Sequence, residues 1–224
     1  MKRRRVLAGC GLAICSGYGA LAPRGVFAAA TPDAPVDSDD ASHFLPLFPL
    51  GVVAFPGEQV LLHIFEPRYK QLMAESAESG NSFGIVTIVP GGASSIGTEM
   101  RFDRLLRTYD DGKMDVTTRG LRVFRLKRFQ REVEGKLYSG GEVSYLRNDP
   151  EVDPEIQGAL VQLFNRMQYR AGSRQVITAP YPENLSFLIG HDVGMNQAEE
   201  LQLLTMAVER DRQAYLFQHL LRRQ

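Results

Sequence analysis

The sequence has only two cysteines, Cys10 and Cys15, and both lie close to the start of the chain. A chain that begins near Thr31 would contain none, which excludes a disulfide framework, a thiol nucleophile and a cysteine metal site. The sequence also lacks net charge, with 26 bases and 26 acids. Residues 1–30 contain five bases and no acid, so the remainder carries 21 bases and 26 acids. This mildly acidic balance argues against bulk attraction to nucleic acid or anionic lipid.

Motifs for nucleotide or hydrolytic chemistry are also missing. Residues 92–98 imitate a phosphate-binding loop, but no lysine precedes the hydroxyl of Thr98, so we expect a loop leading into a strand and no Walker A site. There is no Gly-x-Ser-x-Gly elbow, and Ser186 has no recognisable base partner. We therefore expect no catalytic residue and no cofactor, with a cryptic hydrolase or a protease-associated accessory enzyme as the alternative.

Metal chemistry has equally little support. The histidines are scattered and form no pair at helical spacing; they are His43, His63, His191 and His219. Metal sites on helices need such pairs, usually with a carboxylate nearby. We expect solvated or core-edge histidines and no metal site.

The first thirty residues have the composition of an export signal. Lys2 and three arginines precede an apolar run up to Ala22, and small residues end the segment at Ala30. The run Arg3-Arg4-Arg5-Val6-Leu7 resembles a twin-arginine signal, while an ordinary Sec signal or an uncleaved membrane anchor remains open. We expect export, to a bacterial periplasm, with a cytoplasmic location as the alternative if the start codon is misassigned.

Three segments follow the signal. Residues 31–42, rich in Pro and Asp, predict a flexible spacer. Residues 43–147 alternate short apolar runs with Gly and Pro, which is typical of a small β domain. The apolar period then changes from two to 3.6, so residues 148–224 predict a helical subdomain. The expected strands cover 44–47, 60–65, 83–89, 97–109 with a break, 114–118, 121–129 and 138–145.

Local signals place the helices and one irregular strand. Pro67 after Glu66 predicts a helix inserted among the strands, with Glu66 able to cap it. Further helices are predicted at Asp153-Pro154, over 182–190, at Asn196 with Glu199 as a capping box, and at Asp211 as a cap. The apolar parity changes between Val123 and Phe124, which indicates a bulge or a strand bending around a barrel.

Six motifs, in order, resemble the opening part of the Lon substrate-binding domain family. They are residues 45–58 (Leu-Pro-Leu-Phe-Pro-Leu-Gly-Val-Val-Ala-Phe-Pro-Gly-Glu), 62–69 (Leu-His-Ile-Phe-Glu-Pro-Arg-Tyr), 83–86 (Phe-Gly-Ile-Val), 96–98 (Ile-Gly-Thr), 111–113 (Asp-Gly-Lys) and 118–124 (Thr-Arg-Gly-Leu-Arg-Val-Phe). The resemblance implies an α+β fold, a PUA-like β pseudobarrel of about six strands with one inserted helix, followed by a helical subdomain.

The resemblance also implies a function. In the full-length protease this region helps to recognise unfolded or tagged substrates, while separate ATPase and Ser-Lys peptidase units do the chemistry. We expect a stand-alone, non-catalytic module that binds unfolded or partly folded polypeptides, with a protease as a further partner, in a groove between the β and helical parts. Four aromatic side chains are candidate lining residues: Phe55, Phe65, Tyr69 and Tyr109.

One segment raises a different possibility. Residues 101–131 hold ten bases and four acids, with aromatic residues between them. Basic strands carrying aromatic side chains can meet phosphates and bases, so nucleic-acid binding is a second alternative. A solvated sheet face explains the same pattern, and we regard nucleic acid as the weaker interpretation. The oligomeric state is not predicted.

Overall fold

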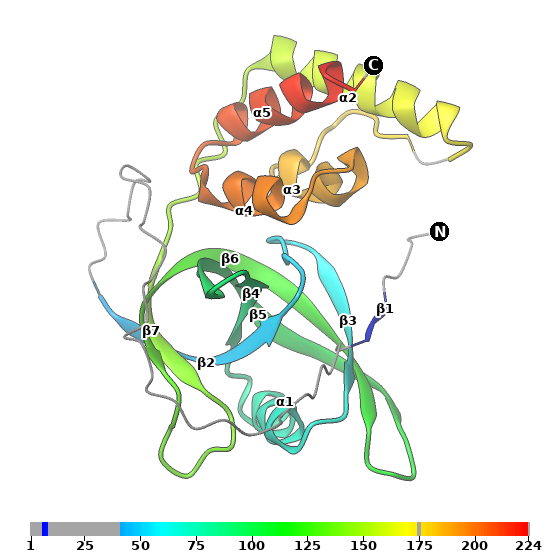
Figure 1. The fold of residues 1–224 in the computed structure, drawn as a ribbon. Helices are drawn as coiled ribbons and strands as arrows, with labels where there is room; N and C mark the ends of the chain where they lie inside the picture. The colour runs from blue at the N-terminus through cyan, green and yellow to red at the C-terminus, as the bar shows by residue number, and fades with distance from the viewer. Residues whose placement is uncertain (1–5, 9–40, 174–175, 224) are drawn as a thin grey trace.

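The computed structural model describes residues 6–8, 41–173 and 176–223, and within them it has a β part and a helical part (Figure 1). Most of the expected signal and spacer lies outside the described residues. The strands are β1 Val6–Ala8, β2 His43–Leu50, β3 Gln59–Ile64, β4 Phe83–Val89, β5 Gly92–Thr108, β6 Met114–Gln130 and β7 Gly140–Tyr145. The helices are α1 Pro67–Ser79, α2 Pro154–Arg170, α3 Leu185–Ile189, the 3-10 helix η1 Gly190–Val193, α4 Gln197–Thr205 and α5 Glu209–Leu221.

The strands form a closed barrel with an extension. The sheet order is β1-β3-β6-β5-β4-β2-β7, and β7 pairs with β6 as well as with β2, which closes the ring. The predicted α+β pseudobarrel is therefore confirmed. β3 lies outside the ring, antiparallel to residues 114–119 of β6. β1 pairs with β3 in parallel, at its other edge.

The observed strands β5 and β6 differ from the sequence-based expectations in three respects. Residues 114–118 and 121–129 are one strand, and β5 begins already at Gly92, where a loop was expected. The pairing stays regular at Val123 and Phe124, so of the two alternatives predicted there the bulge is wrong. The other alternative, a strand that bends around a barrel, is confirmed, because β6 pairs with β5 and with β7 and so closes the ring. Both neighbours are buried, on opposite faces. Val123 packs in the cluster shared with the helices, and Phe124 packs inside the barrel.

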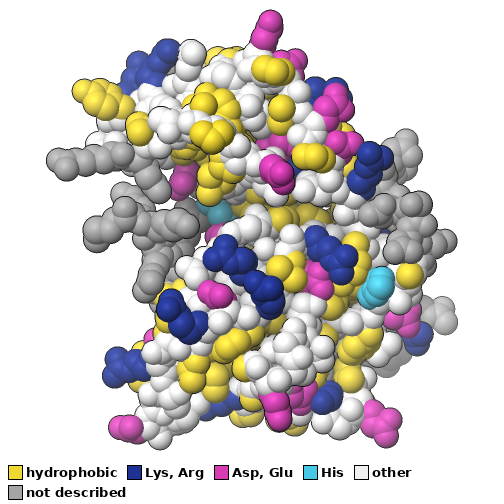
Figure 2. Space-filling view, turned by 180° about the vertical axis from the view of Figure 1, so that it is seen from behind, with side chains coloured by type: hydrophobic (Ala, Val, Ile, Leu, Met, Phe, Trp, Pro, Cys, Tyr) yellow, Lys and Arg dark blue, Asp and Glu magenta, His cyan; other side chains and the backbone are white. Residues whose placement is uncertain are grey.

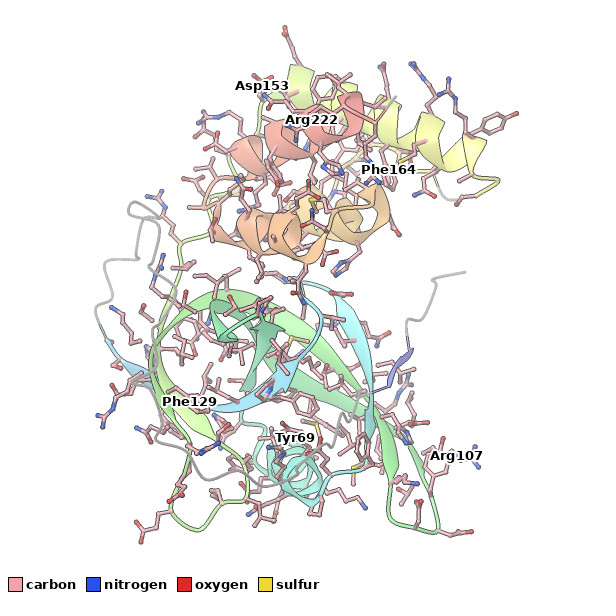
Figure 3. The ribbon with its side chains drawn as sticks, in the orientation of Figure 1. Tyr69, Arg107, Phe129, Asp153, Phe164 and Arg222 are labelled. Atoms are coloured by element: carbon pink, nitrogen blue, oxygen red, sulfur yellow. The ribbon has the colours of Figure 1, made fainter. Side chains whose placement is uncertain are left out.

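Helix α1 closes one end of the barrel. Pro67 occupies its first turn as predicted, since proline has no N–H to leave unpaired there. The Glu66 side chain makes no capping hydrogen bond and accepts one from Arg68 Nε (2.8 Å) instead, so its expected capping role is wrong. Tyr69 and Met73 pack with Phe48 in the barrel core, and Figure 3 shows Tyr69 facing the barrel.

The helical part follows its capping signals closely. Asp153 accepts hydrogen bonds from Glu155 N (2.9 Å) and Ile156 N (3.2 Å), and Asn196 forms the predicted capping box with Glu199. The helix expected over 182–190 is shorter and begins at Leu185.

The start of α5 differs from the prediction at Asp211. The helix begins at Glu209, because the Glu209 and Arg210 amides donate to the carbonyls of Asp149 (2.9 Å) and Glu151 (2.8 Å). Residues 146–153, the connector between β7 and α2, thus supply backbone acceptors that satisfy the start of α5 without a side-chain cap.

The two parts share one hydrophobic core. The largest cluster joins Val53, Phe55 and Ile96 from the β part to Leu185 and Leu203 from the helices. Phe55 is fully buried at this seam. Because the shared side chains leave water only when the two parts are in contact, their burial favours one fixed arrangement.

Candidate functional site

A cluster of polar side chains joins the β part to the helical part at their interface, which we call the seam. His191 of η1 lies 4.4 Å from the Phe55 ring, measured between centroids. Its Nδ1 lies 2.7 Å from a Glu200 carboxylate oxygen, and its Nε2 lies 3.1 Å from Glu58 Oε2. Glu58 Oε2 also accepts a hydrogen bond from Phe55 N (3.0 Å). The three side chains therefore link the β2–β3 loop to both η1 and α4.

His191, Glu58 and Glu200 carry opposite charges, and we call these three side chains the clamp. Burial of the His191 ring disfavours its charged form, but the carboxylates of Glu200 and Glu58 outweigh that effect and raise the pKa of His191 to about 9. The imidazole is thus a cation at neutral pH, held between two acids. Local sequence gave no signal for the contact, because Glu58 and His191 are far apart in the chain and no motif relates them.

The seam is hollowed beside the clamp, as Figure 2 shows on the left, between the helical part above and the β part below. The cavity has a volume of about 110 Å³. Gly51, Val53, Glu58, His191 and Glu200 are among its lining residues. Pockets for small-molecule ligands usually measure about 300–1,000 Å³, so this hollow admits a side chain but no stretch of polypeptide. Beside His191, the groove expected between the two parts is narrowed to this hollow.

The four candidate lining residues fall into two groups. Phe55 and Tyr69 lie in the core, with 0% and 7% of their surface exposed, so they present no surface to a partner here. Phe65 and Tyr109 are half-buried on one outer face of the β part. His63 lies between them, with ring centroids 6.3 Å from Phe65 and 5.7 Å from Tyr109. We call His63, Phe65 and Tyr109, together with Asp115, the aromatic face.

Hydrogen bonds hold the aromatic face in place. Asp115 Oδ1 lies 2.6 Å from His63 Nδ1, and Asp115 Oδ2 accepts a hydrogen bond from the Tyr109 hydroxyl (2.8 Å). These two contacts hold the pKa of the Asp115 carboxyl below its usual range. The same carboxylate is the main reason that the pKa of Tyr109 is raised. The face is therefore an ordered surface of rings next to one ionised carboxylate, beside β3.

The basic strands do not form an uninterrupted cationic stripe. Arg122 donates to the buried Glu99 carboxylate (2.7 Å) and lies over the Tyr145 ring. Other bases of this segment have partners as well: Lys113 with Asp111, Arg128 with Glu142, and Arg107 over Tyr109. Figure 2 shows acidic and apolar side chains between the basic ones on that face. This mixture is that of a solvated sheet face, and it does not favour nucleic acid.

Buried polar groups of the helical part form a second network that the sequence did not reveal. Ser186 is fully buried, where its hydroxyl donates to Glu209 Oε2 (2.6 Å) and accepts from Arg212 Nε (2.9 Å). Arg212 also donates to the Asn148 side chain (2.7 Å) and to Met206 O (2.7 Å). Ser186, Glu209 and Arg212 are buried while Asn148 is exposed, so the network anchors the buried face of α5 to the connector.

Two features are absent from the residues that the structure describes. No group of three or more His, Cys, Asp or Glu side chains is arranged to hold a metal ion there. Within the same residues, no helix is long and apolar enough to span a bilayer.

Comparisons with known proteins identify the domain. The family model of the ATP-dependent protease La (LON) substrate-binding domain matches residues 44–222. A Lon N-terminal domain protein from Xanthomonas campestris has a similar structure, with 29% identity and a TM-score of 0.62, covering 79% of this chain and 98% of that one. The N-terminal domain of the Mycobacterium avium complex Lon protease matches in fold, with 17% identity, a TM-score of 0.62, and 80% and 98% coverage. No curated protein matches.

The family match includes every element from β2 to α5, and the two similar structures are Lon N-terminal domains. The matched family is the substrate-binding unit of Lon and is distinct from its catalytic unit. By this match over most of its length, the chain belongs to the LON substrate-binding domain family.

Proposed function

We propose that this protein is a non-catalytic polypeptide-binding module that acts as an exported adaptor or chaperone-like protein. The observation that carries the proposal is the match of residues 44–222 to a family defined by substrate binding. The aromatic face supports it, since half-buried rings on the outside of the sheet offer apolar contact area at low entropic cost. Its partners are unfolded or partly folded polypeptides, and a protease is a further candidate partner.

Binding to unfolded protein tests the proposal directly. Purified full-length chain is titrated against fluorescein-labelled, reduced and alkylated α-lactalbumin, with the native calcium-bound form as the control. We expect saturable binding at micromolar concentrations to the unfolded form only, and no peptide products on long incubation. Equal affinity for both forms, or none for either, would contradict the proposal. Peptide products that disappear when Ser186 or a histidine is replaced would favour the hydrolase alternative.

Export is part of the same proposal and rests on the composition of residues 1–30. The tagged chain is recovered from separated periplasmic and cytoplasmic fractions of its host, and its mass is measured. A periplasmic chain trimmed near Ala30 supports export. An untrimmed cytoplasmic chain contradicts it and leaves polypeptide binding to be judged by the titration alone.

A further inference from the structure

Two strand edges are not paired with a strand of the ring: the outer edge of β3 and the outer edge of the second half of β5. They differ in the features that protect an edge from an added strand. The outer edge of β5 continues beyond Met100, where its pairing with β4 stops. Arg101, Arg104 and Arg107 lie on this segment, and its register against β6 shifts twice after Phe102. Charged side chains and bulges are the devices by which natural proteins protect sheet edges from added strands.

The outer edge of β3 has none of these devices. Its sequence, Gln-Val-Leu-Leu-His-Ile, contains no Lys, Arg, Asp, Glu or Pro. All six of its residues pair with β6 in one unbroken register. A regular, uncharged edge strand is a ready template for another strand. Leu62 and Ile64 are buried in the barrel core, so β3 is held rigidly in position.

A strand already lies on this edge. β1, the uncharged segment Val6–Ala8, pairs with β3 in parallel, with Val6 at the register position of Leu61 and Ala8 at that of His63. Figure 1 shows β1 as the dark blue strand beside β3. The segment belongs to the apolar run of the expected signal, not to the family domain that begins at residue 44. The edge therefore accepts an extended apolar segment from outside the domain.

We propose that the outer edge of β3 is the binding site for an extended, uncharged apolar segment of an unfolded polypeptide, which adds to the sheet as a parallel strand. The inference rests on the proposed function and gives it a location. β1 occupies the site in cis, as an internal competitor, and signal removal in the proposed export leaves the edge open. Backbone hydrogen bonds along Leu61–His63 provide affinity without demanding a sequence.

The aromatic face gives the site its selectivity. Leu61 and His63 of β3, and Phe65 directly after it, alternate with the core residues and share the outer side of the sheet. Every second side chain of an added strand then lies beside these three, where an apolar or aromatic group gains contact area. The ionised Asp115 carboxylate, paired with His63, disfavours acidic side chains at the same position.

The first measurement uses a soluble probe, a fluorescein-labelled peptide with the sequence of Arg3–Ala8. It is titrated against the full-length chain and against its Val6→Pro/Leu7→Pro variant, in which one of the two replaced N–H groups is a donor to the ladder. We expect the variant to bind the probe up to about tenfold more tightly, because that hydrogen bond of the competing strand is lost. Equal binding to both chains would overturn the competition in cis.

The second measurement separates strand addition from side-chain docking. Alternate N–H groups of a strand point toward its partner, so N-methylation of the probe at Leu7 or at Ala8 should have opposite outcomes. We expect one methylated probe to bind about tenfold more weakly and the other almost as well as the parent. Leu61→Lys should weaken binding, while Leu105→Lys on the exposed β5 segment serves as the matched control.

The outcomes distinguish the two proposals. If unfolded α-lactalbumin binds but neither N-methylation nor Leu61→Lys has an effect, the protein binds polypeptide elsewhere and the β3 site is wrong. If α-lactalbumin does not bind, while the two N-methylated probes still differ as expected, the β3 edge binds only the chain's own segment. The proposal that unfolded polypeptides are the partner is then wrong. Loss of both kinds of binding in the Leu61→Lys variant, with an unchanged circular dichroism spectrum, supports the site.

Discussion

Single residues of the barrel show how closely its strands approach. Gly97 of β5 lies where an added Cβ would be 2.4 Å from Ile85 O and 2.6 Å from the Phe124 ring. The ring and the carbonyl belong to the two strands on either side of β5, so neither can move alone. Gly158 of α2, by contrast, has no heavy atom within 4 Å of such a Cβ.

This contrast predicts opposite effects of the same substitution. Gly97→Ala should lower the free energy of unfolding by about 1–3 kcal/mol or more, because the barrel must open to admit the methyl group. Gly158→Ala should raise it by about 0.5–1 kcal/mol, because alanine loses less backbone entropy in a helix interior. Urea unfolding followed by circular dichroism measures both. A Gly97→Ala variant as stable as the wild type would show that the strands are not this close.

At the scale of elements, α5 depends on its buried ion pair. Arg212 Nη2 lies 2.8 Å from Glu209 Oε2, with both side chains almost fully enclosed, and the Arg212 guanidinium lies 4.3 Å from the centre of the Phe187 ring. Gln213 Nε2 donates to the other carboxylate oxygen (2.8 Å). Such a pair contributes little net stability over apolar packing, but removing one partner leaves a charge without compensation.

Arg212→Met should therefore lower the free energy of unfolding by about 3–5 kcal/mol, since it leaves the Glu209 carboxylate buried and unpaired. The double variant Arg212→Met/Glu209→Gln should be more stable than Arg212→Met alone, because the buried charge is gone. Arg210→Met is the matched control on the same helix. Its partners, Glu151 and Asp211, are exposed, so it should stay close to the wild type. A double variant less stable than Arg212→Met in urea unfolding would refute this account.

The helix starts show what the sequence could and could not predict at this scale. Asp153 and Asn196 cap α2 and α4 as predicted, because a cap joins a side chain to a backbone amide only two or three residues away. The start of α5 was misplaced at Asp211, because its amides bond to Asp149 and Glu151 in a distant part of the chain. A hydrogen-bond partner that lies far away in the sequence cannot be recognised from the residues next to the helix start.

At the scale of the whole molecule, the clamp at His191 couples the two parts to pH. The pKa of His191 rises from 6.5 to about 9 on folding, so its charged form stabilises the folded chain. Because the pKa is higher in the folded chain, the charged ring adds to the free energy of unfolding. This stabilisation is fully present below pH 6.5 and is lost as the pH rises through about 9. The shift corresponds to on the order of 3 kcal/mol, an upper limit for a ring shared by two carboxylates.

His191→Gln should consequently destabilise the chain most at pH 6, by up to about 3 kcal/mol, and much less at pH 9.5. Urea unfolding at both pH values measures the difference between variant and wild type, which cancels other titrating groups. His43→Gln, at an exposed histidine, is the matched control and should cost little stability. If the cost of His191→Gln is the same at both pH values, the ring is not a cation held between Glu58 and Glu200.

The sequence by itself determined the fold class, most element positions and the family, because apolar periods, prolines and caps act over a few residues and the motifs stand in a fixed order. Only the tertiary structure decided which aromatic residues are available to a partner: Phe55 and Tyr69 became core, while Phe65 and Tyr109 came together around Asp115. It also decided that β3 lies outside the ring, with only β1 on its outer side, and that His191 joins the two parts. Burial and strand neighbours are set by contacts between distant segments, and no local pattern records them.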